Sequence, residues 1–398
     1  MLVPKLRFKR DDGTEYPEWG KKTILEICEP HARIGWQNLR TDEFLDEGDY
    51  YLVTGTDFQN GRVNFDTCHY IDKTRYEQDK NIQITNGSIL ITKDGTLGKI
   101  ALVENMDKNG TLNAGIFVLQ NLDESIYNIY LFQYLTAPYL LNFTFDKSTG
   151  GTIKHLNQGI LAQFPVPIPC SEEQHKIADF LSTVDEVIAQ SEKEVQNLEQ
   201  QKKAAMQKIF SQEVRFRRDD GREYPEWGKK KVAEVFKITR GYVLSTKLVR
   251  SIVDKNYCFP VFSSQTKDNG LLGYYNNYLY ENAITWTTDG ANAGTVRFRN
   301  GKFYCTNVCG VLMSDNGYAN QCIAEYLNSI ASKYVSYVGN PKLMNNIMAE
   351  IPILVPCLEE QQKIADFLSA YDEAISYAKQ ELDKWKELKK GLLQQMFV

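Results

Sequence analysis

Two long stretches of the chain repeat apolar residues at intervals that alternate between four and three positions. The first stretch follows Pro169 and the second follows Pro356, and both open with paired glutamates, which favour the positive end of a helix dipole. Such spacing over about five heptads is typical of a coiled coil rather than a simple surface helix. We predict two helices of about 38 residues, each roughly 57 Å long at ~1.5 Å per residue. The apolar seam, which is also the surface offered to a partner, comprises Ile177, Leu181, Ile188, Val195 and Leu198 in the first helix and Ile364, Leu368, Ile375, Leu382 and Trp385 in the second.

The two helix sequences share one register. Residues 169–188 and 356–375 are identical at fifteen of twenty positions, at an offset of 187, and Lys202 and Lys389 interrupt the seam at the same place. We interpret this match as two helices packed against each other in an antiparallel coiled coil with pseudo-twofold symmetry. Two independent amphipathic helices, each packed on its own domain, are the alternative. The shared lysine either fixes the register, as buried polar residues do in coiled coils, or extends its charge to the edge of the seam.

A second repeat lies outside the helices. Residues 7–22 and 215–230 are identical at fourteen of sixteen positions, at an offset of 208, and both contain YPEWG. Internal repeats indicate a duplicated architecture. Because the segments between the repeats hardly resemble each other, the sequence indicates one scaffold that presents two different readers. The repeated aromatic residues are predicted to be packing anchors rather than ligand contacts: Tyr16, Trp19, Tyr224 and Trp227.

The inserts at 23–168 and 231–355 are rich in β-branched and aromatic residues and lack long helical periodicity. SILITKDGTLGKI at 88–100 and AITWTTDGANAGTV at 283–296 both indicate a strand, an Asp-Gly turn and a second strand. Short helices are predicted near 129–140 and 320–332, and each insert ends in a proline-rich exit. The expected fold class is α+β, with two β-rich domains joined by the two long helices. The predicted boundaries are 1–168 for the first domain, 169–212 for the central helix, 213–357 for the second domain and 358–398 for the C-terminal helix.

The length and composition indicate how many domains to expect, and the charge is unevenly distributed along the chain. A chain of 398 residues with 42% hydrophobic content suggests two to three globular domains. The net charge of −5 combines −5 in residues 1–168, −3 in 169–212, +5 in 213–357 and −2 in 358–398. Because local patches govern docking on a polyanion, the total charge neither establishes nor excludes DNA binding.

Several classes of function lack their signatures. No apolar run is long enough for a membrane span and the first residues have no secretory core, so a cytoplasmic protein is expected. Cys305 and Cys309 are four residues apart, but no histidine follows His175, which disfavours a metal site and favours free buried thiols. Phosphate-loop, dinucleotide and adenine-methyltransferase motifs are absent, and the four histidines have no triad spacing. We therefore expect a non-catalytic chain.

These features resemble the specificity (S) subunits of type I restriction–modification enzymes over nearly the whole chain. The strongest local matches are SEEQHKIADFLS and LEEQQKIADFLS, each after a proline-rich exit. PVFSSQTKDNGLLGYY, ITWTTDGANAGTV and NPKLMNN in the second insert also look like a recurrent target-recognition domain of that family. The first insert departs from the second by being 21 residues longer and net negative.

The resemblance implies a function and a set of partners. Each variable domain would read one half of a bipartite site in double-stranded DNA, and the paired helices would set the unread gap. Two methyltransferase (modification) subunits would bind the helices and methylate adenine N6, and two restriction subunits would supply the motor and nuclease. The chain itself would hold no cofactor, since S-adenosylmethionine, ATP and Mg are expected on the partner subunits. A scaffold that binds only proteins and a fused enzyme with an unrecognised site are the rival interpretations.

Candidate DNA contacts are polar or basic residues in the predicted loops. Arg or Lys can read guanine in the major groove, and Asn or Gln can read adenine. For each candidate the alternative is an ordinary solvated loop residue. The candidates are Arg33, Gln37, Asn38, Arg40, Lys93, Thr96, Lys154 and His155 in the first domain, and Arg240, Tyr242, Ser264, Gln265, Lys267, Thr288, Asn292, Asn340 and Lys342 in the second.

Overall fold

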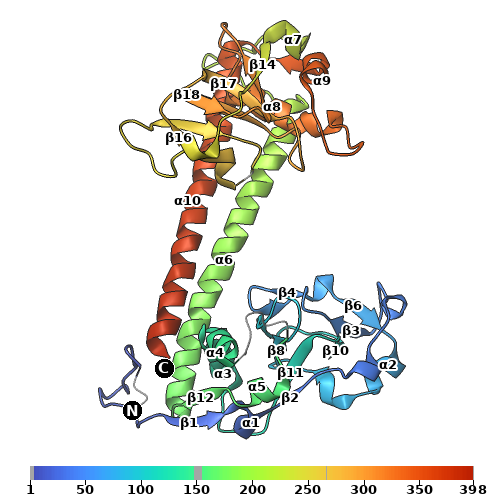
Figure 1. Cartoon of the computed structure of the whole chain (residues 1–398), viewed down its shortest axis with the longest axis vertical. Coiled ribbons are helices and arrows are strands. Elements are labelled where there is room, and N and C mark those ends of the chain that lie inside the picture. The colour runs from blue at the N-terminus through green and yellow to red at the C-terminus, as the bar shows by residue number, and fades with distance from the viewer. Residues whose placement is uncertain (1–3, 148–154, 266, 398) are drawn as a thin grey trace. The chain divides into compact units, whose positions relative to one another are not determined.

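The computed structural model describes residues 4–147, 155–265 and 267–397. They form two compact units, one comprising Met1–Lys193 with Lys379–Val398 and the other Glu194–Ala378 (Figure 1). The predicted long helices are present as α6 (Ser171–Phe210) and α10 (Leu358–Met396), and each contributes one part to each unit. Within the described ranges, no helix combines the length and the apolar character needed to cross a membrane.

The first unit contains a β-rich reader, here called the first reader (residues 20–168). Its strands are β1 (Gly20–Thr23), β2 (Cys28–His31), β3 (Tyr50–Val53), β4 (Phe58–Gln59), β5 (Arg62–Val63), β6 (His69–Ile71), β7 (Gln83–Ile84), β8 (Ile89–Thr92), β9 (Ile100–Leu102), β10 (Asn109–Leu112), β11 (Ile116–Asn121) and β12 (Pro165–Ile168). Its helices are α1 (Ile24–Ile27), α2 (Lys73–Glu77), α3 (Asn128–Thr136), α4 (Tyr139–Lys147) and α5 (Gln158–Ala162), with short 3-10 turns η1 (Gly35–Gln37), η2 (Thr41–Glu43), η3 (Phe65–Thr67) and η4 (Lys80–Ile82). The strands form a six-stranded sheet ordered β2-β11-β8-β9-β5-β4, a four-stranded sheet ordered β6-β3-β10-β7, and the pair β1-β12.

The second unit contains the second reader (residues 228–355). Its strands are β13 (Gly228–Lys231), β14 (Lys237–Arg240), β15 (Phe259–Phe262), β16 (Leu271–Tyr275), β17 (Tyr280–Thr287), β18 (Val296–Cys305), β19 (Cys309–Met313) and β20 (Pro352–Val355). Its helices are α7 (Val232–Val235), α8 (Gln321–Ile330) and α9 (Asn345–Glu350), with 3-10 turns η5 (Thr246–Leu248), η6 (Lys267–Gly270) and η7 (Ala331–Tyr334). The strands form a six-stranded sheet ordered β14-β19-β17-β18-β15-β16 and the pair β13-β20.

The two readers share a plan despite their different sequences. The order β2-β11-β8-β9 in the first reader corresponds to β14-β19-β17-β18 in the second, and all of these neighbours pair antiparallel. The strand–turn–strand predictions are confirmed by β8–β9 and β17–β18, and the short-helix predictions by α3 and α8. A four-stranded second sheet occurs only in the first reader among the described residues, and no sequence pattern predicted it.

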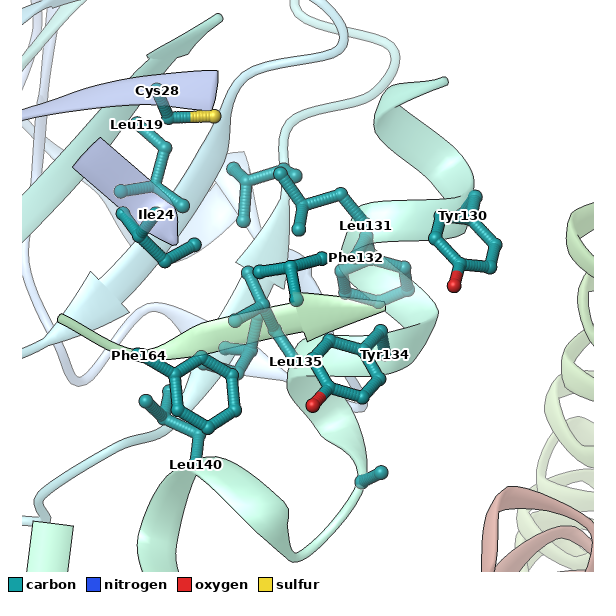
Figure 2. Close-up of a cluster of buried hydrophobic side chains, with 14 of the residues drawn as sticks. Ile24, Cys28, Leu119, Tyr130, Leu131, Phe132, Tyr134, Leu135, Leu140 and Phe164 are labelled. Atoms are coloured by element: carbon teal, nitrogen blue, oxygen red, sulfur yellow. The ribbon is translucent and has the colours of Figure 1, made fainter. Parts of the chain in front are cut away.

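One face of each six-stranded sheet packs against helices. In the first reader, Leu131 and Leu135 of α3 join Ile24, Leu119 and Phe164 in one buried cluster (Figure 2). In the second reader, Ile323 and Leu327 of α8 pack with Ile284, Trp286 and Leu312 of the sheet. The helices thus cover the equivalent face of the six-stranded sheet in both readers. The strand ends and the opposite face of the sheet are where the two readers differ.

The first repeated segment is fixed to the start of α6 by a buried carboxylate. The Glu173 side chain is fully buried and accepts from Arg7 Nε and Nη2 at 2.8 and 2.9 Å and from Trp19 Nε1 at 2.9 Å. The hydrogen bond to Glu173 raises the pKa of Arg7. Tyr16 and Trp19 are buried, which confirms their prediction as packing anchors.

The second copy repeats this arrangement at the start of α10. The fully buried Glu360 accepts from Arg215 Nη2 at 2.9 Å and from Trp227 Nε1 at 2.8 Å, and Tyr224 and Trp227 are buried. A carboxylate in the first turn also interacts favourably with the helix dipole. The RF…YPEWG repeat therefore encodes the joint between each reader and its long helix.

The long helices pack antiparallel within each unit. In the first unit Lys386 pairs with Glu192 at 2.7 Å and Lys389 with Asp185 at 2.5 Å, so the α10 numbering rises as that of α6 falls. In the second unit, Ile209 of α6 lies in one cluster with Ile364 and Leu368 of α10. These contacts favour the paired helices over two independent ones.

The lysines that interrupt the seam form partly buried ion pairs. Lys389 Nζ meets Asp185, and the same carboxylate accepts from Gln133 Nε2 of α3 at 2.7 Å. In the second unit, Lys202 Nζ lies 2.8 Å from both Asp372 of α10 and Glu325 of α8. Burial opposes the charge of Lys202, but the hydrogen bonds to Asp372 and Glu325 outweigh it and raise its pKa.

These pairs are copies of each other with the helices exchanged. Asp185 and Asp372 are related by the same offset of 187 as Lys202 and Lys389. In one pair α6 provides the lysine and α10 the aspartate, and in the other pair the helices change roles, as a pseudo-twofold axis predicts. Both pairs can form at once only when the two helices keep the register that the sequence repeat indicates. The Lys202 and Lys389 side chains are 14% and 17% exposed, so they lie at the partly solvated margin of the seam while their ion pairs across it favour this register.

The predicted seam residues all lose exposure. Those that are buried are Ile177, Leu181, Val195, Ile364, Leu368, Ile375 and Leu382, and those that are half-buried are Ile188, Leu198 and Trp385.

We expect Glu173→Gln and Glu360→Gln each to lower the unfolding free energy by about 3 kcal/mol, because each leaves a largely buried arginine without its counter-charge. Denaturant unfolding measures the change. The matched controls are Glu172→Gln and Glu359→Gln, whose side chains are 54% and 69% exposed and whose ion pairs should contribute less than about 1 kcal/mol. Equal losses in the variants and their neighbours would contradict the anchoring role.

Candidate nucleic-acid interface

In the first reader, the Asp-Gly turn packs against the segment that leads to the exit. The turn joins β8 to β9, and Lys93 O accepts from Leu156 N at 2.8 Å. His155 Nδ1 contacts the Asp94 carboxylate on the exposed side. The turn and residues 155–156 together are called the first edge, which places the backbone of Lys93 beside Leu156 and the side chain of His155 beside Asp94.

The second reader builds an equivalent edge. Gly290 N donates to Pro341 O at 2.9 Å, and Leu343 N donates to Thr288 O at 2.9 Å. Trp286 Nε1, fully buried below, donates to Leu343 O at 2.9 Å and holds the segment in place. The turn at 288–294 with residues 340–343 is called the second edge.

The two edges correspond residue by residue. Leu156 and Leu343 are 187 positions apart, as are His155 and Lys342, and both leucines donate to the residue before the Asp-Gly pair. The sequence paired the two turns but gave no reason to join each turn to a segment about 50–60 residues later. The same scaffold therefore presents His155 in one reader and Lys342 in the other.

Further candidates of the second reader lie around the second edge. Asn292 Nδ2 donates to Ser264 O at 3.1 Å, which brings the loop after β15 against the turn. Arg240 ends β14 opposite Gly310 and donates to Asn307 O, while Tyr242 is 62% exposed. The side chains of Arg240, Gln265, Lys267, Asn340 and Lys342 are exposed, and those of Ser264 and Asn292 are half-buried.

Three candidates are not surface residues, and the expectation that they lie exposed on loops is wrong. Arg33 is 1% exposed because its Nε donates to Leu112 O at 2.9 Å and its Nη1 to Gln37 O at 3.3 Å. Burial lowers the pKa of Arg33. Gln37 is 4% exposed and Thr288 1%. Their side chains shape the loops from beneath.

The other candidates of the first reader differ in placement. Asn38 and Arg40 are exposed beside η1 and η2, and Lys93 is half-buried with Nζ 5.5 Å from the centre of the Phe117 ring. Lys154 lies outside the described residues. No contact joins Asn38 or Arg40 to the first edge among the hydrogen bonds of the described residues.

Two arginines absent from the predicted contacts lie beside Ser264 and Gln265. Arg297 and Arg299 project from β18 into a pocket that these residues help to line. Burial, with a smaller effect of Arg297, lowers the pKa of Arg299 to about 10. Their spacing of two in VRFRN marks one face of a strand, a signal that was open to sequence reasoning.

The sequence has clear relatives. The family described as the type I restriction modification DNA specificity domain matches residues 16–200 and 224–386. S.MpnORF507P, a putative type I specificity subunit of Mycoplasma pneumoniae, is 38% identical over 157 residues, or 39% of this chain and 42% of that protein. A second one from this organism, S.MpnORF615P, is 34% identical over 219 residues, or 54% of this chain and 84% of that protein. The match therefore spans less than half of the first relative and most of the second.

A solved structure has the same fold. The S subunit of a type I restriction–modification system from M. genitalium aligns with a TM-score of 0.62 and 18% identity, over 100% of this chain and 99% of that one. At this identity the likeness concerns the fold alone.

We expect Lys342→Ala to weaken the binding of a cognate DNA duplex on the order of tenfold and to reduce the slope of log affinity against log salt by about 0.9, because one phosphate contact is lost. Filter binding over a salt series measures both. Lys229→Ala removes an exposed lysine from β13 and is the matched control. An unchanged affinity and slope would remove Lys342 from the interface.

Proposed function

The chain belongs to the type I restriction–modification DNA specificity family, and from this premise we propose that it is the DNA-recognition subunit of such a complex. Each reader recognises one half of a bipartite double-stranded site through its edge. The observation that carries the proposal is the pair of equivalent edges with unlike side chains on one duplicated frame. The repeated segments of the frame and the starts of its long helices are closely similar in the two halves, so folding of the frame does not require the edges to differ. We therefore attribute the difference between the two edges to the different DNA half-sites that they contact.

The electrostatics of the readers support different modes of contact. Residues 213–357 carry +5, which suits direct attraction to phosphates, whereas residues 1–168 carry −5. The first reader therefore depends on local donors at the first edge, such as Lys93 and the neighbouring His155. DNA binding by the two readers should differ in salt dependence for this reason.

The helix pair sets the separation of the two half-sites. Half-sites one DNA turn apart require readers about 34–36 Å apart. A coiled coil of fixed register keeps the distance between the readers constant, whereas a flexible linker would allow a wide range of distances. The ion pairs of Lys202 and Lys389 contribute by excluding other registers.

The partners of the frame are two copies of one modification subunit. The frame repeats one exposed aromatic pair. Phe180 and Phe367 of the long helices are 39% and 36% exposed. The ring of Phe180 packs against that of Phe8, and the ring of Phe367 against that of Phe216, with 5.6 Å between ring centres in both pairs. A twice-presented surface suits two identical partners. In this proposal those partners supply methylation with S-adenosylmethionine, restriction subunits supply ATP- and Mg-dependent cleavage, and the assembly works in the cytoplasm.

A scaffold that binds only proteins is the second candidate. The unlike edges would then be docking sites for two different proteins. Retention of specific genomic fragments by the chain with its partner subunits separates the two functions, because a protein scaffold retains no sequence preferentially.

Methylation mapping tests the proposal directly. Cells that carry the gene should show one bipartite adenine-methylated motif, and cells lacking only this gene should lose that motif while their partner subunits remain. An unchanged set of methylated motifs would overturn the proposal.

We expect a four-residue insertion in both α6 and α10 to widen the gap of the motif by about two base pairs. Four residues add roughly 6 Å at ~1.5 Å each and slightly more than one helical turn of ~3.6 residues, so the helix faces stay within about 40° of their alignment. At ~3.4 Å per base pair this equals about two pairs. Methylation mapping of the variant measures the gap, with four substitutions at the same positions as the control. A motif of unaltered spacing would contradict the role of the helices.

A further inference from the structure

The second reader contains a polar pocket that none of the candidate contacts explains. It is a narrow recess with an internal volume of about 10 Å³, is partly open to solvent, and lies between β17, β18 and the loop after β15. Its walls carry the hydroxyl groups of Ser263, Ser264, Thr285, Thr287 and Thr295. Arg297 and Arg299 supply the positive charge.

Arg299 is held rigidly at the base of this pocket. It is 9% exposed, its Nε donates to Thr285 Oγ1 at 3.0 Å, its Nη1 donates to Asn269 O at 2.9 Å, and its guanidinium lies 3.7 Å from the centre of the Phe262 ring. Among the described residues, its Nη2 makes no hydrogen bond. One donor of a fixed guanidinium is therefore left for a ligand.

Neither arginine has a counter-charge. Arg297 Nη1 donates to the neutral Asn269 Oδ1 at 2.8 Å, and no carboxylate of the described residues forms an ion pair with Arg297 or Arg299. A buried charge without a partner destabilises the fold. Arg299 is buried and Arg297 is half-buried, and a bound anion would supply the counter-charge that both lack among the described residues.

The first reader shows that the fold does not need them. By strand pairing, Ala101 and Val103 occupy the positions of Arg297 and Arg299, since Leu90–Ala101 and Ile91–Ile100 match Thr285–Arg297 and Trp286–Val296. Ala101 and Val103 are fully buried in the core between the two sheets. The described residues of the second reader form no equivalent sheet there, and Thr285, Arg297 and Arg299 lie on the same face.

We propose that this pocket binds a phosphate of the DNA backbone and so positions the second reader on its half-site. The inference rests on the proposed DNA-recognition function and adds a specific anchor to it. The recess is too small to enclose a phosphate, so the anion would sit at its mouth. Phosphates project from a duplex and can reach such a mouth, whereas base edges lie on the floor of a groove. Paired guanidinium donors with surrounding hydroxyls match the oxygens of a phosphate diester. Ser264 and Gln265 then act in holding the backbone rather than in reading bases.

The first experiment measures anion binding without DNA. The full-length chain is heated in increasing inorganic phosphate at constant ionic strength. The unfolding midpoint should rise by a few degrees for wild type and for Arg250→Gln, an exposed arginine outside the pocket, because a ligand of the folded state stabilises it. Arg297→Gln should remove most of this rise. A rise that is the same in Arg297→Gln as in wild type would overturn the site.

The second experiment uses the cognate duplex and the complex with its partner subunits. Single methylphosphonates, which remove one phosphate charge each, are placed along the second half-site. One position should weaken wild-type binding about tenfold and Arg297→Gln binding less than twofold. Equal sensitivity of both proteins at every position, or loss only with 7-deazaguanine in place of guanine, would overturn the proposal, the latter by assigning the arginines to a base edge.

Two points keep the tests separable. Arg299 is buried and its replacement could unfold the protein, so the main test uses Arg297→Gln at a half-buried residue. Arg299→Lys is the second variant, provided that its unfolding midpoint in phosphate-free buffer equals that of wild type. If wild type binds phosphate through Arg297 but recognises no DNA motif, the pocket stands as an anion site while the proposed function and its DNA ligand fail. If DNA recognition persists without the phosphate effect, only the pocket fails.

Discussion

The architecture depends on one buried carboxylate at the start of each long helix. Glu173 and Glu360 tie the helix to the segment that precedes each reader, and each does so through an arginine and an indole that are themselves largely removed from water. Because the charge sits in the first helical turn, the helix dipole, the ion pair and the aromatic packing favour the same geometry. The two readers can differ in sequence because the joint that attaches each one to its long helix is the same in both halves.

Divergence is confined to surfaces that the frame leaves open. The six-stranded sheets turn the same face to helices in both readers, whereas the other face carries a second sheet in one and a charged pocket in the other. The strand ends follow the same logic, with His155 and Lys342 at equivalent places on equivalent edges. A common scaffold thus supports two domains of opposite net charge, −5 in residues 1–168 and +5 in residues 213–357.

The sequence predicted what repetition and periodicity encode, and missed what long-range packing decides. Heptad spacing and the offset of 187 were sufficient for the helices, their pairing and their seam residues, and the Asp-Gly pairs located both turns. Periodicity could not show that Arg33 folds inward onto the Leu112 carbonyl, because a polar loop residue and a buried one look alike in sequence. The spacing of Arg297 and Arg299 was open to sequence reasoning, but only the folded chain shows that they share a recess in which no carboxylate of the described residues pairs with them.

The central claim is that each reader acts alone on one half-site while the helices fix the interval. Exchanging residues 231–355 for the second reader of another family member, with the frame left intact, tests it most directly by methylation mapping. We expect a motif in which one half changes and the other half and the gap stay as they were. A motif altered in both halves or in its gap, or not altered at all, would contradict it.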